Sequence, residues 1–431
     1  MTEPMLANTG SAPLMVNGYD GSRGGDLPAR TAGLIAWRDA ALGGAYRLFY
    51  QRPVEFVRGE GVYLYDADGN AYLDAYNNVP SVGHSHPRIT EAVTRQLATL
   101  NTHTRYLTDG VVGYAERLLA THLADQPGTL HTMFTCTGSE AGDLALRIAR
   151  QHTGGSGVIV TANAYHGVTA ALAEVSPSLG ANVPLGPHVR TVPAPGPGVD
   201  FAAGVAAAIA DLRRHGVRLA AFLADTLFSS DGVVPGPPGF LRLVADLVHA
   251  AGGLYIADEV QPGFGRTGSH MWGYQRHGLA PDIVTMGKPM GNGLPIAGIV
   301  ARREVLADFG RKARYFNTFG GNPVCVAAAS AVLGEVRGAG LYLGVDVVSP
   351  ADGEPSAALA SAIVNGMRER RVLISATGPR GHVLKIRPPP PFAREHADVF
   401  AGVLADVLAE AGRLVEERDR ADLDGLTGVR R

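Results

Sequence analysis

The sequence contains little lysine, little cysteine and no long apolar run. Three lysines, at positions 288, 312 and 385, stand among 38 basic residues, and the other 35 are arginine. Two cysteines, Cys136 and Cys325, cannot form a disulfide framework in a chain of 431 residues, which indicates a reducing environment. No run reaches the roughly 20 apolar residues of a membrane span, and the first residues do not read as a signal peptide. We therefore expect a cytoplasmic protein with no membrane partner.

An excess of charge of one sign is also absent. The net charge of -2 gives no reason to expect a nucleic-acid partner. The 14 histidines are scattered, and a local hydrogen bond explains the one close pair, His84 and His86, better than a metal site. We therefore expect no bound metal. In contrast, a chain of this length with 46% hydrophobic residues can bury a large interior in two or three domains.

The chain is predicted to alternate apolar strands with helices over much of its length. After a short helix at 31–42 we expect an antiparallel meander over 53–76. From residue 87, helices alternate with apolar runs, which is typical of a largely parallel sheet covered on both faces. The helices are expected at 87–100, 113–124, 140–152 and 324–333, and the strands at 131–136, 157–162, 219–225, 252–258, 282–286 and 295–301. The Pro- and Gly-rich segment 186–201 is expected to be a connection.

This pattern divides the chain into three parts. Residues 1–80 are assigned to an N-terminal segment and part of a small domain, 81–333 to a large domain, and 334–431 to a C-terminal small domain.

Unusual residues follow several of the predicted strands. In an open parallel sheet, ligands bind at the carboxyl ends of the strands. The stretch TCTGSEAGD (135–143) begins a helix there, and its backbone N–H groups could bind a phosphate. An ordinary capped helix N-terminus would show the same residue pattern. Asp258 and Glu259 end a buried strand, where carboxylates need partners. Lys288 follows another strand, and unlike arginine it can become a nucleophilic amine.

A phosphate cradle, a carboxylate and such a lysine at successive strand ends are what pyridoxal phosphate requires. With LFYQRPVEFVRGEGVYLYD, TGSEA, AYHG, DEVQ, MGKPMG, NTFGGNP and VLKIRPPPPF, the sequence resembles the class III pyridoxal-phosphate aminotransferases of fold type I over nearly its whole length. The resemblance implies an α/β fold with a mostly parallel seven-stranded sheet in the large domain. It also implies a small α+β domain built from both termini.

The resemblance implies roles for individual residues. Lys288 would form the Schiff base, and Asp258 would hold the pyridine nitrogen protonated. Thr318 would reach the phosphate bound in the neighbouring subunit, which implies a homodimer with a shared active site. The other cofactor-binding positions would be Gly138 and Ser139 at the phosphate, Tyr165 stacked on the ring with His166 beside it, Val260 behind the ring, Gln261 at the phenolic oxygen, and Asp225.

The sequence departs from the family pattern at three places. Most members have a long helical stretch after the helix at 324–333, which is absent here, so that either this helix leads almost directly into the small domain or the stretch is missing from this sequence. Asp225 and Thr226 stand where Glu-Pro is common, and Lys385 stands where aminotransferases usually have a carboxylate-binding arginine. Arg387 follows two residues later, on the same side of a strand. The motifs around Asn78, Arg105 and Lys385 resemble those of the phospholyase-like subgroup, and two cations suit a phosphate dianion. An exposed edge strand with solvated charges is the alternative.

Three functions remain open from the sequence. The family favours transamination between a small amine or amino acid and a keto acid or aldehyde, through the Lys288 Schiff base. The pair Lys385 and Arg387 instead favours a lyase that eliminates phosphate, or another leaving group, from an activated amine. A non-catalytic relative is the third, and the intact Lys288 and Asp258 argue against it.

Overall fold

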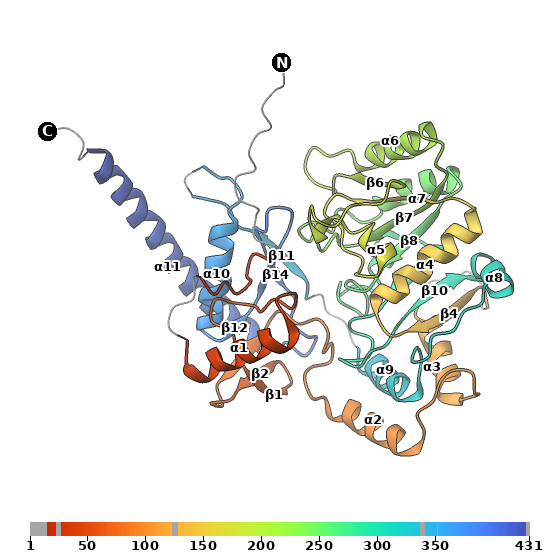
Figure 1. Cartoon of the computed structure of the whole chain (residues 1–431), viewed down its shortest axis with the longest axis horizontal. Helices are drawn as coiled ribbons and strands as arrows, with labels where there is room; N and C mark the ends of the chain where they lie inside the picture. The colour runs from red at the N-terminus through yellow and green to blue at the C-terminus, as the bar shows by residue number, and fades with distance from the viewer. Residues whose placement is uncertain (1–14, 23–26, 123–127, 337–340, 351, 428–431) are drawn as a thin grey trace.

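The computed structural model describes residues 15–22, 27–122, 128–336, 341–350 and 352–427. Within this part of the chain the strands form a seven-stranded, a four-stranded and a three-stranded sheet. Figure 1 shows the seven-stranded sheet with its helices on one side of the molecule, and the two smaller sheets with α10 and α11 on the other.

The seven-stranded sheet is mostly parallel, as expected. Strands β9, β8, β7, β5 and β6 are paired in parallel, whereas β10 runs antiparallel to both of its neighbours, β4 and β9. The order across the sheet is β4 (Leu130–Thr135), β10 (Ala297–Arg302), β9 (Ile283–Met286), β8 (Leu254–Asp258), β7 (Leu219–Asp225), β5 (Gly157–Thr161) and β6 (Val189–Val192).

Strand β6 corrects the prediction that 186–201 is only a connection. Its four residues form the sheet edge beside β5, with Val189 and Val192 buried. A strand this short, enclosed by Pro and Gly, carries too little apolar alternation to be distinguished from a loop.

Helices cover both faces of this sheet because side chains alternate along each strand. In β8, Tyr255 and Ala257 belong to one hydrophobic cluster, and Leu254 and Ile256 belong to the other. The first cluster includes residues of α2 (Pro87–Thr99), α3 (Asp109–Leu119), α6 (Phe201–Arg214), α7 (Leu241–Ala250) and α9 (Pro323–Glu335). The second includes residues of α4 (Gly138–Thr153), α5 (Ala170–Ala173) and α8 (Arg303–Lys312). Two short 3-10 helices occupy Pro177–Leu179 and Gly273–His277.

The small sheets combine residues from both ends of the chain. The predicted meander is present as β1 (Phe56–Glu60), β2 (Tyr63–Asp66) and β3 (Ala71–Asp74), and β12 (Val372–Leu373) pairs in parallel with β3. The third sheet places β14 (Val383–Ile386) between β11 (Leu343–Asp346) and β13 (Ser375–Thr377). Helices α10 (Ala357–Glu369) and α11 (Arg394–Thr427) follow β11 and β14.

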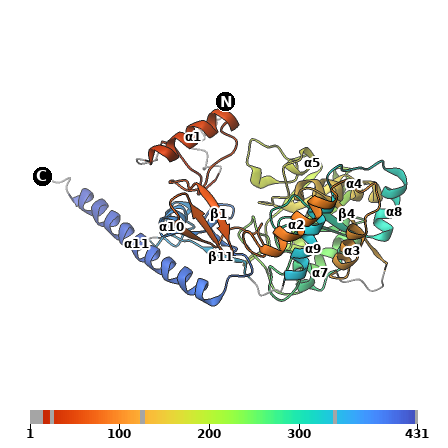
Figure 2. The ribbon, with the colours of Figure 1, turned by 90° about the horizontal axis from the view of Figure 1, so that it is seen from below.

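The N-terminal helix α1 (Ala29–Leu42) contributes no residue to the two hydrophobic clusters of the large sheet or to the cluster of the small sheets. None of its residues is buried, and Figure 2 shows it away from the small sheets, on the side opposite α11. Helix α3 ends at Leu119, before the predicted end at 124, and the rest of that prediction falls partly outside the described residues. The short connection after Leu333 also falls partly outside them, and the boundaries 1–80, 81–333 and 334–431 stay a prediction.

Candidate active site

Lys288 lies at the edge of the sheet where the carboxyl ends of β7, β8 and β9 meet. The register sets Asp225 opposite Asp258, and Asp258 opposite Thr285, three residues before the lysine. Burial lowers the pKa of the Lys288 amine to about 8, and Asp258 acts in the opposite direction by favouring the charged form. Lys288 is therefore partly deprotonated near neutral pH, as a nucleophile or base requires.

Asp258 is held as a carboxylate by three donors. Its Oδ2 lies 2.7 Å from Nδ1 of His166, and its Oδ1 accepts from the Val260 N–H and the Thr285 hydroxyl at 3.1 Å each. Burial on its own would raise the pKa of Asp258. The His166 hydrogen bond and charge, the Val260 N–H and Lys288 outweigh it and leave the pKa below its ordinary value. A buried carboxylate whose charged form is favoured therefore lies near the lysine.

The start of α4 forms a narrow cradle beside these residues. Thr137 and Glu140 form a capping box, so the ordinary helix start that the sequence allowed is present. Gly138 lies so close to Val260 that an added Cβ would be 2.9 Å from Cγ1 of the valine. The helix N-terminus thus combines amide donors with a backbone that only glycine allows to approach this closely.

Ser139, Tyr165 and His166 surround the same region. The Ser139 hydroxyl accepts from the Val168 N–H at 3.1 Å, and the backbone N–H of His166 donates to Ser176 at 3.0 Å. Burial, with a contribution from Asp258, raises the pKa of the Tyr165 hydroxyl. The Nε2 atom of His166 is buried and has no hydrogen-bond partner in the described part of the chain. One edge of this imidazole is therefore fixed by Asp258, and the other is available to a ligand.

The carboxylates of Asp225 and Glu259 are used mainly by the protein itself. Asp225 accepts from the backbone N–H groups of Leu227 and Ser229, two and four residues later. Glu259 accepts from the Thr226 hydroxyl and from the N–H groups of Gly273 and Tyr274. Burial raises the pKa of both, that of Glu259 to about 7. Both side chains thus stabilise loops around Asp258.

Lys385 and Arg387 are buried rather than exposed, so the alternative of solvated charges on an edge strand is wrong. They are 7% and 5% exposed, and β14 is the central strand of its sheet. Both donate to the same oxygen, Oε1 of Gln261, at 3.3 Å from Lys385 Nζ and 2.8 Å from Arg387 Nη1. Lys385 also donates to the Ser229 carbonyl at 3.3 Å.

Tyrosines complete this arrangement and were missed by the sequence analysis. The hydroxyl of Tyr342 donates to Gln261 Oε1 at 3.2 Å, and the Arg387 guanidinium lies 4.7 Å from the ring of Tyr76 and 5.8 Å from that of Tyr342. We call Gln261, Tyr342, Lys385 and Arg387 the Gln261 cluster. Residues so far apart in sequence give no local signal that they meet.

Three residues with predicted binding roles lie outside the Gln261 cluster. Asn78 is 2% exposed, and its buried Nδ2 has no hydrogen-bond partner among the residues that the structure describes. Arg105 is exposed and stacks on Phe316, with 3.7 Å between the guanidinium carbon and the ring centre. Thr318 is exposed as well. Arg105 and Thr318 therefore face outward from this chain, and their predicted roles stay predictions.

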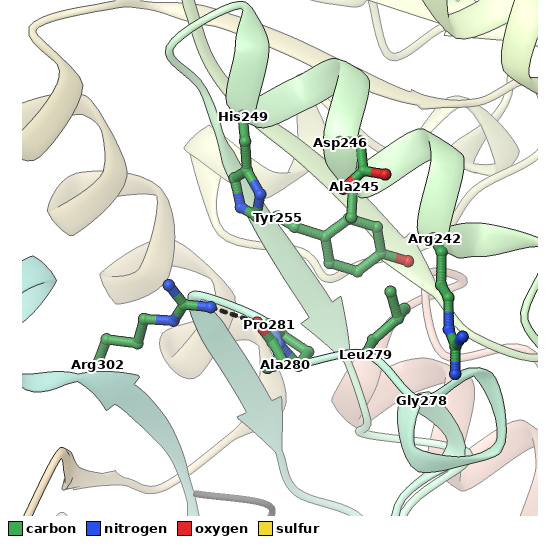
Figure 3. Close-up of a pocket in the computed structure, with 10 residues that line it drawn as sticks. All are labelled: Arg242, Ala245, Asp246, His249, Tyr255, Gly278, Leu279, Ala280, Pro281 and Arg302. Carbon is green, nitrogen blue, oxygen red and sulfur yellow. Dashed lines mark hydrogen bonds between the residues drawn. The ribbon is translucent and has the colours of Figure 1, made fainter. Parts of the chain in front are cut away.

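The surface pocket in Figure 3 lies at the other edge of the sheet. Its lining includes Tyr255 near the start of β8, Pro281 before β9 and Arg302 at the end of the antiparallel β10. These positions mark the amino ends of the parallel strands, opposite the edge that carries Asp258 and Lys288. In the described part of the chain no group of three metal-ligating side chains is present, and no helix is long and apolar enough to cross a membrane.

The residues at the carboxyl edge fit pyridoxal phosphate. The cradle at Gly138 can take a phosphate, Asp258 can hold a protonated ring nitrogen, and Lys288 has an amine that loses its proton near neutral pH. When bound, the cofactor would supply an electron sink for a carbanion formed next to the substrate nitrogen.

Comparisons with known proteins agree with this geometry. The aminotransferase class-III family matches residues 49–334. The chain is 38% identical to alanine–glyoxylate aminotransferase 2-like of Drosophila melanogaster, with 85% of each chain covered. It is 34% identical to ethanolamine-phosphate phospho-lyase homolog 1 of Caenorhabditis elegans, with 83% of this chain and 89% of that protein covered.

Among solved structures, a phospholyase from Arthrobacter in complex with phosphoethanolamine is 46% identical. It superposes with a TM-score of 0.83 over 87% of this chain and 99% of that one. These matches confirm the fold, the cofactor and the resemblance to the phospholyase-like subgroup. The chain is a member of the class III pyridoxal-phosphate-dependent aminotransferase family.

Proposed function

We propose that the protein eliminates phosphate from a small phosphorylated amine. The observation that carries the proposal is the buried pair Lys385 and Arg387. Among the described residues neither cation has a carboxylate partner in an ion pair, and both share one neutral oxygen of Gln261. Asp225 favours the charged form of Lys385 at longer range, but buried cations without a carboxylate in direct contact are costly unless a ligand neutralises them. A phosphate dianion supplies two negative charges and several acceptor oxygens.

The chain's own residues suit each part of this reaction. The Lys288 amine can take the proton from the carbon next to the substrate nitrogen, because its pKa lies near 8. The negative charge of Asp258 would lie beside the pyridine nitrogen of the bound cofactor and hold it protonated. Lys385 and Arg387 would hold the phosphate on the adjacent carbon and stabilise it as it leaves with the electrons of the C–O bond.

Transamination is the second candidate, and the sequence alone favoured it. It is supported by the 38% identical relative, whose name describes an aminotransferase. Lys385 would then bind a substrate carboxylate, and Arg387 would have no role in recognition. The same fold and lysine serve both reactions, so the anion-binding residues must distinguish them.

One experiment separates the candidates. The holoenzyme is incubated with phosphoethanolamine, and in parallel with amino acids and glyoxylate or pyruvate, and inorganic phosphate and aminated products are measured separately. We expect phosphate release without a requirement for a keto acid. Keto-acid-dependent amination without phosphate release would refute the proposal and favour transamination.

We also propose that the protein is a cytoplasmic homodimer with a shared active site. Thr318 is exposed, and Tyr106, Leu107, Phe316 and Phe319 near Arg105 expose 65%, 100%, 38% and 69% of their surface. Such an apolar surface is typical of an interface. Light scattering should give twice the chain mass, and Thr318→Ala should weaken pyridoxal phosphate binding. A monomer with full activity would contradict this proposal.

A further inference from the structure

The Gln261 cluster joins three donors to one acceptor. Lys385 Nζ, Arg387 Nη1 and the Tyr342 hydroxyl lie 3.3, 2.8 and 3.2 Å from Oε1 of Gln261. An amide oxygen has two lone pairs, so it cannot satisfy three donors fully. The donors are therefore arranged for an acceptor with more lone pairs and more negative charge than the amide offers.

Two buried donors, one on Arg387 itself and one on Asn78, lack a hydrogen-bond partner among the described residues. Nε of Arg387 and Nδ2 of Asn78 are buried, and neither forms a hydrogen bond within the described protein. Unsatisfied buried donors are rare in folded proteins and usually mark the place of a ligand, an ion or water. The main chain of Arg387 is anchored separately, because its N–H donates to the Ala75 carbonyl at 2.7 Å.

Tyr342 holds the cluster together in two ways. Its ring lies 5.8 Å from the Arg387 guanidinium carbon and 5.7 Å from Lys385 Nζ, which restricts both cations by cation–π contact. Burial raises the pKa of its hydroxyl, so the hydroxyl stays protonated and acts as a donor. Tyr76 covers Arg387 at 4.7 Å. The Arg387 guanidinium therefore contacts two aromatic rings while its Nη1 donates to Gln261.

We propose that Tyr342 is a specificity-determining residue for the anionic end of the substrate. Its hydroxyl forms the third donor to a tetrahedral phosphate that displaces Gln261 Oε1, and its ring fixes the two cations in position. This inference rests on the function proposed above, because it assigns a phosphate to the Gln261 cluster. A carboxylate has two oxygens in one plane and a single charge, so it matches three donors that converge from different directions less well than a phosphate dianion with three oxygens.

The test measures anion binding directly and does not depend on turnover. Isothermal titration calorimetry of the holoenzyme with inorganic phosphate is compared for wild type, Tyr342→Phe and Gln261→Glu. Tyr342→Phe removes one hydrogen bond to a charged group, so the dissociation constant should rise about 10-fold to 100-fold. Gln261→Glu places a carboxylate between the cations and should abolish phosphate binding. Tyr46→Phe, which alters a tyrosine that is 66% exposed, is the matched control and should bind phosphate like wild type.

The outcomes separate this inference from the proposed function. Phosphate binding by Tyr342→Phe within twofold of wild type would overturn the role of Tyr342, even if wild type releases phosphate from phosphoethanolamine. Unchanged binding by Gln261→Glu would show that the anion binds elsewhere, which also overturns the inference. If wild type neither binds inorganic phosphate nor releases it from phosphoethanolamine, the proposed function itself is wrong. The visible absorption of bound cofactor, compared across variants, shows that each retains a loaded and folded site.

Discussion

Replacing Asp258 by asparagine keeps the shape of the side chain but removes its buried charge. In the wild type, Oδ1 accepts from Val260 and Thr285, while Oδ2 faces His166 Nδ1 at 2.7 Å. The asparagine oxygen can keep the first two bonds, which turns its NH₂ group toward His166. The imidazole must then accept at Nδ1 and carry its proton on Nε2. One substitution therefore changes both the charge and the histidine tautomer.

Two measurable effects follow. Loss of a preorganised charge at the reacting centre should cost about 3–4 kcal/mol, or a 10²- to 10³-fold decrease in kcat. Asp258 also favours the protonated form of Lys288, so its removal should move the pKa of the lysine below its present value of about 8. The basic form of Lys288 would then be populated at lower pH, and the acidic limb of the kcat/KM profile should shift to lower pH.

Asp225→Asn is the matched control. It removes a buried carboxylate from the neighbouring strand, but the hydrogen bonds that Asp225 accepts come from loop N–H groups and not from His166. Its kcat should stay within about tenfold of wild type. The argument is refuted if Asp258→Asn retains kcat within a few-fold, or if the acidic limb moves to higher pH.

Three further predictions test the other parts of the site. Lys288→Arg should abolish turnover without unfolding the protein, because arginine keeps the charge but cannot form the imine. Borohydride reduction of the wild type should attach the cofactor to Lys288. Labelling of another lysine would contradict this assignment. Gly138→Ala should weaken pyridoxal phosphate binding about tenfold, since the new Cβ would lie 2.9 Å from Val260, and Val260→Ala should restore part of it. Arg387→Ala should lower kcat/KM about 10- to 100-fold for a phosphorylated amine and little for its unphosphorylated counterpart; equal losses would exclude the phospholyase.

The sequence predicted the large sheet and its catalytic edge because both depend on local patterns. Buried parallel strands appear as short apolar runs between helices, and chemically unusual residues at their ends, such as Asp258 and Lys288, are visible one strand at a time. Strand β6 was missed because four residues between prolines and glycines carry almost no periodicity. The contact between His166 and Asp258 could not be predicted either, since 92 residues separate them and no local rule sets their distance.

The Gln261 cluster shows the same limit more clearly. The spacing of Lys385 and Arg387 predicts that both side chains lie on one face of a strand, and the structure confirms this. Whether that face meets solvent or the large sheet depends on how the small domain packs, which the spacing does not contain. In the structure both residues are buried against Gln261, and Tyr342, which directly precedes β11, joins them. Burial, rather than spacing, turns two charges into a candidate anion site.

The three lysines illustrate how far residue choice alone can be interpreted. Lys312 is exposed at the end of α8 and pairs with Asp308, as Arg311 also does, so arginine would serve there equally well. At position 288 arginine cannot replace the nucleophilic amine. At position 385 burial, then Arg387, lowers the pKa of the amine well below its ordinary value while Asp225 acts in the opposite direction, a sensitivity to surroundings that arginine lacks. Rarity therefore draws attention to all three lysines, but only burial beside other charges distinguishes the two that lie at the candidate active site.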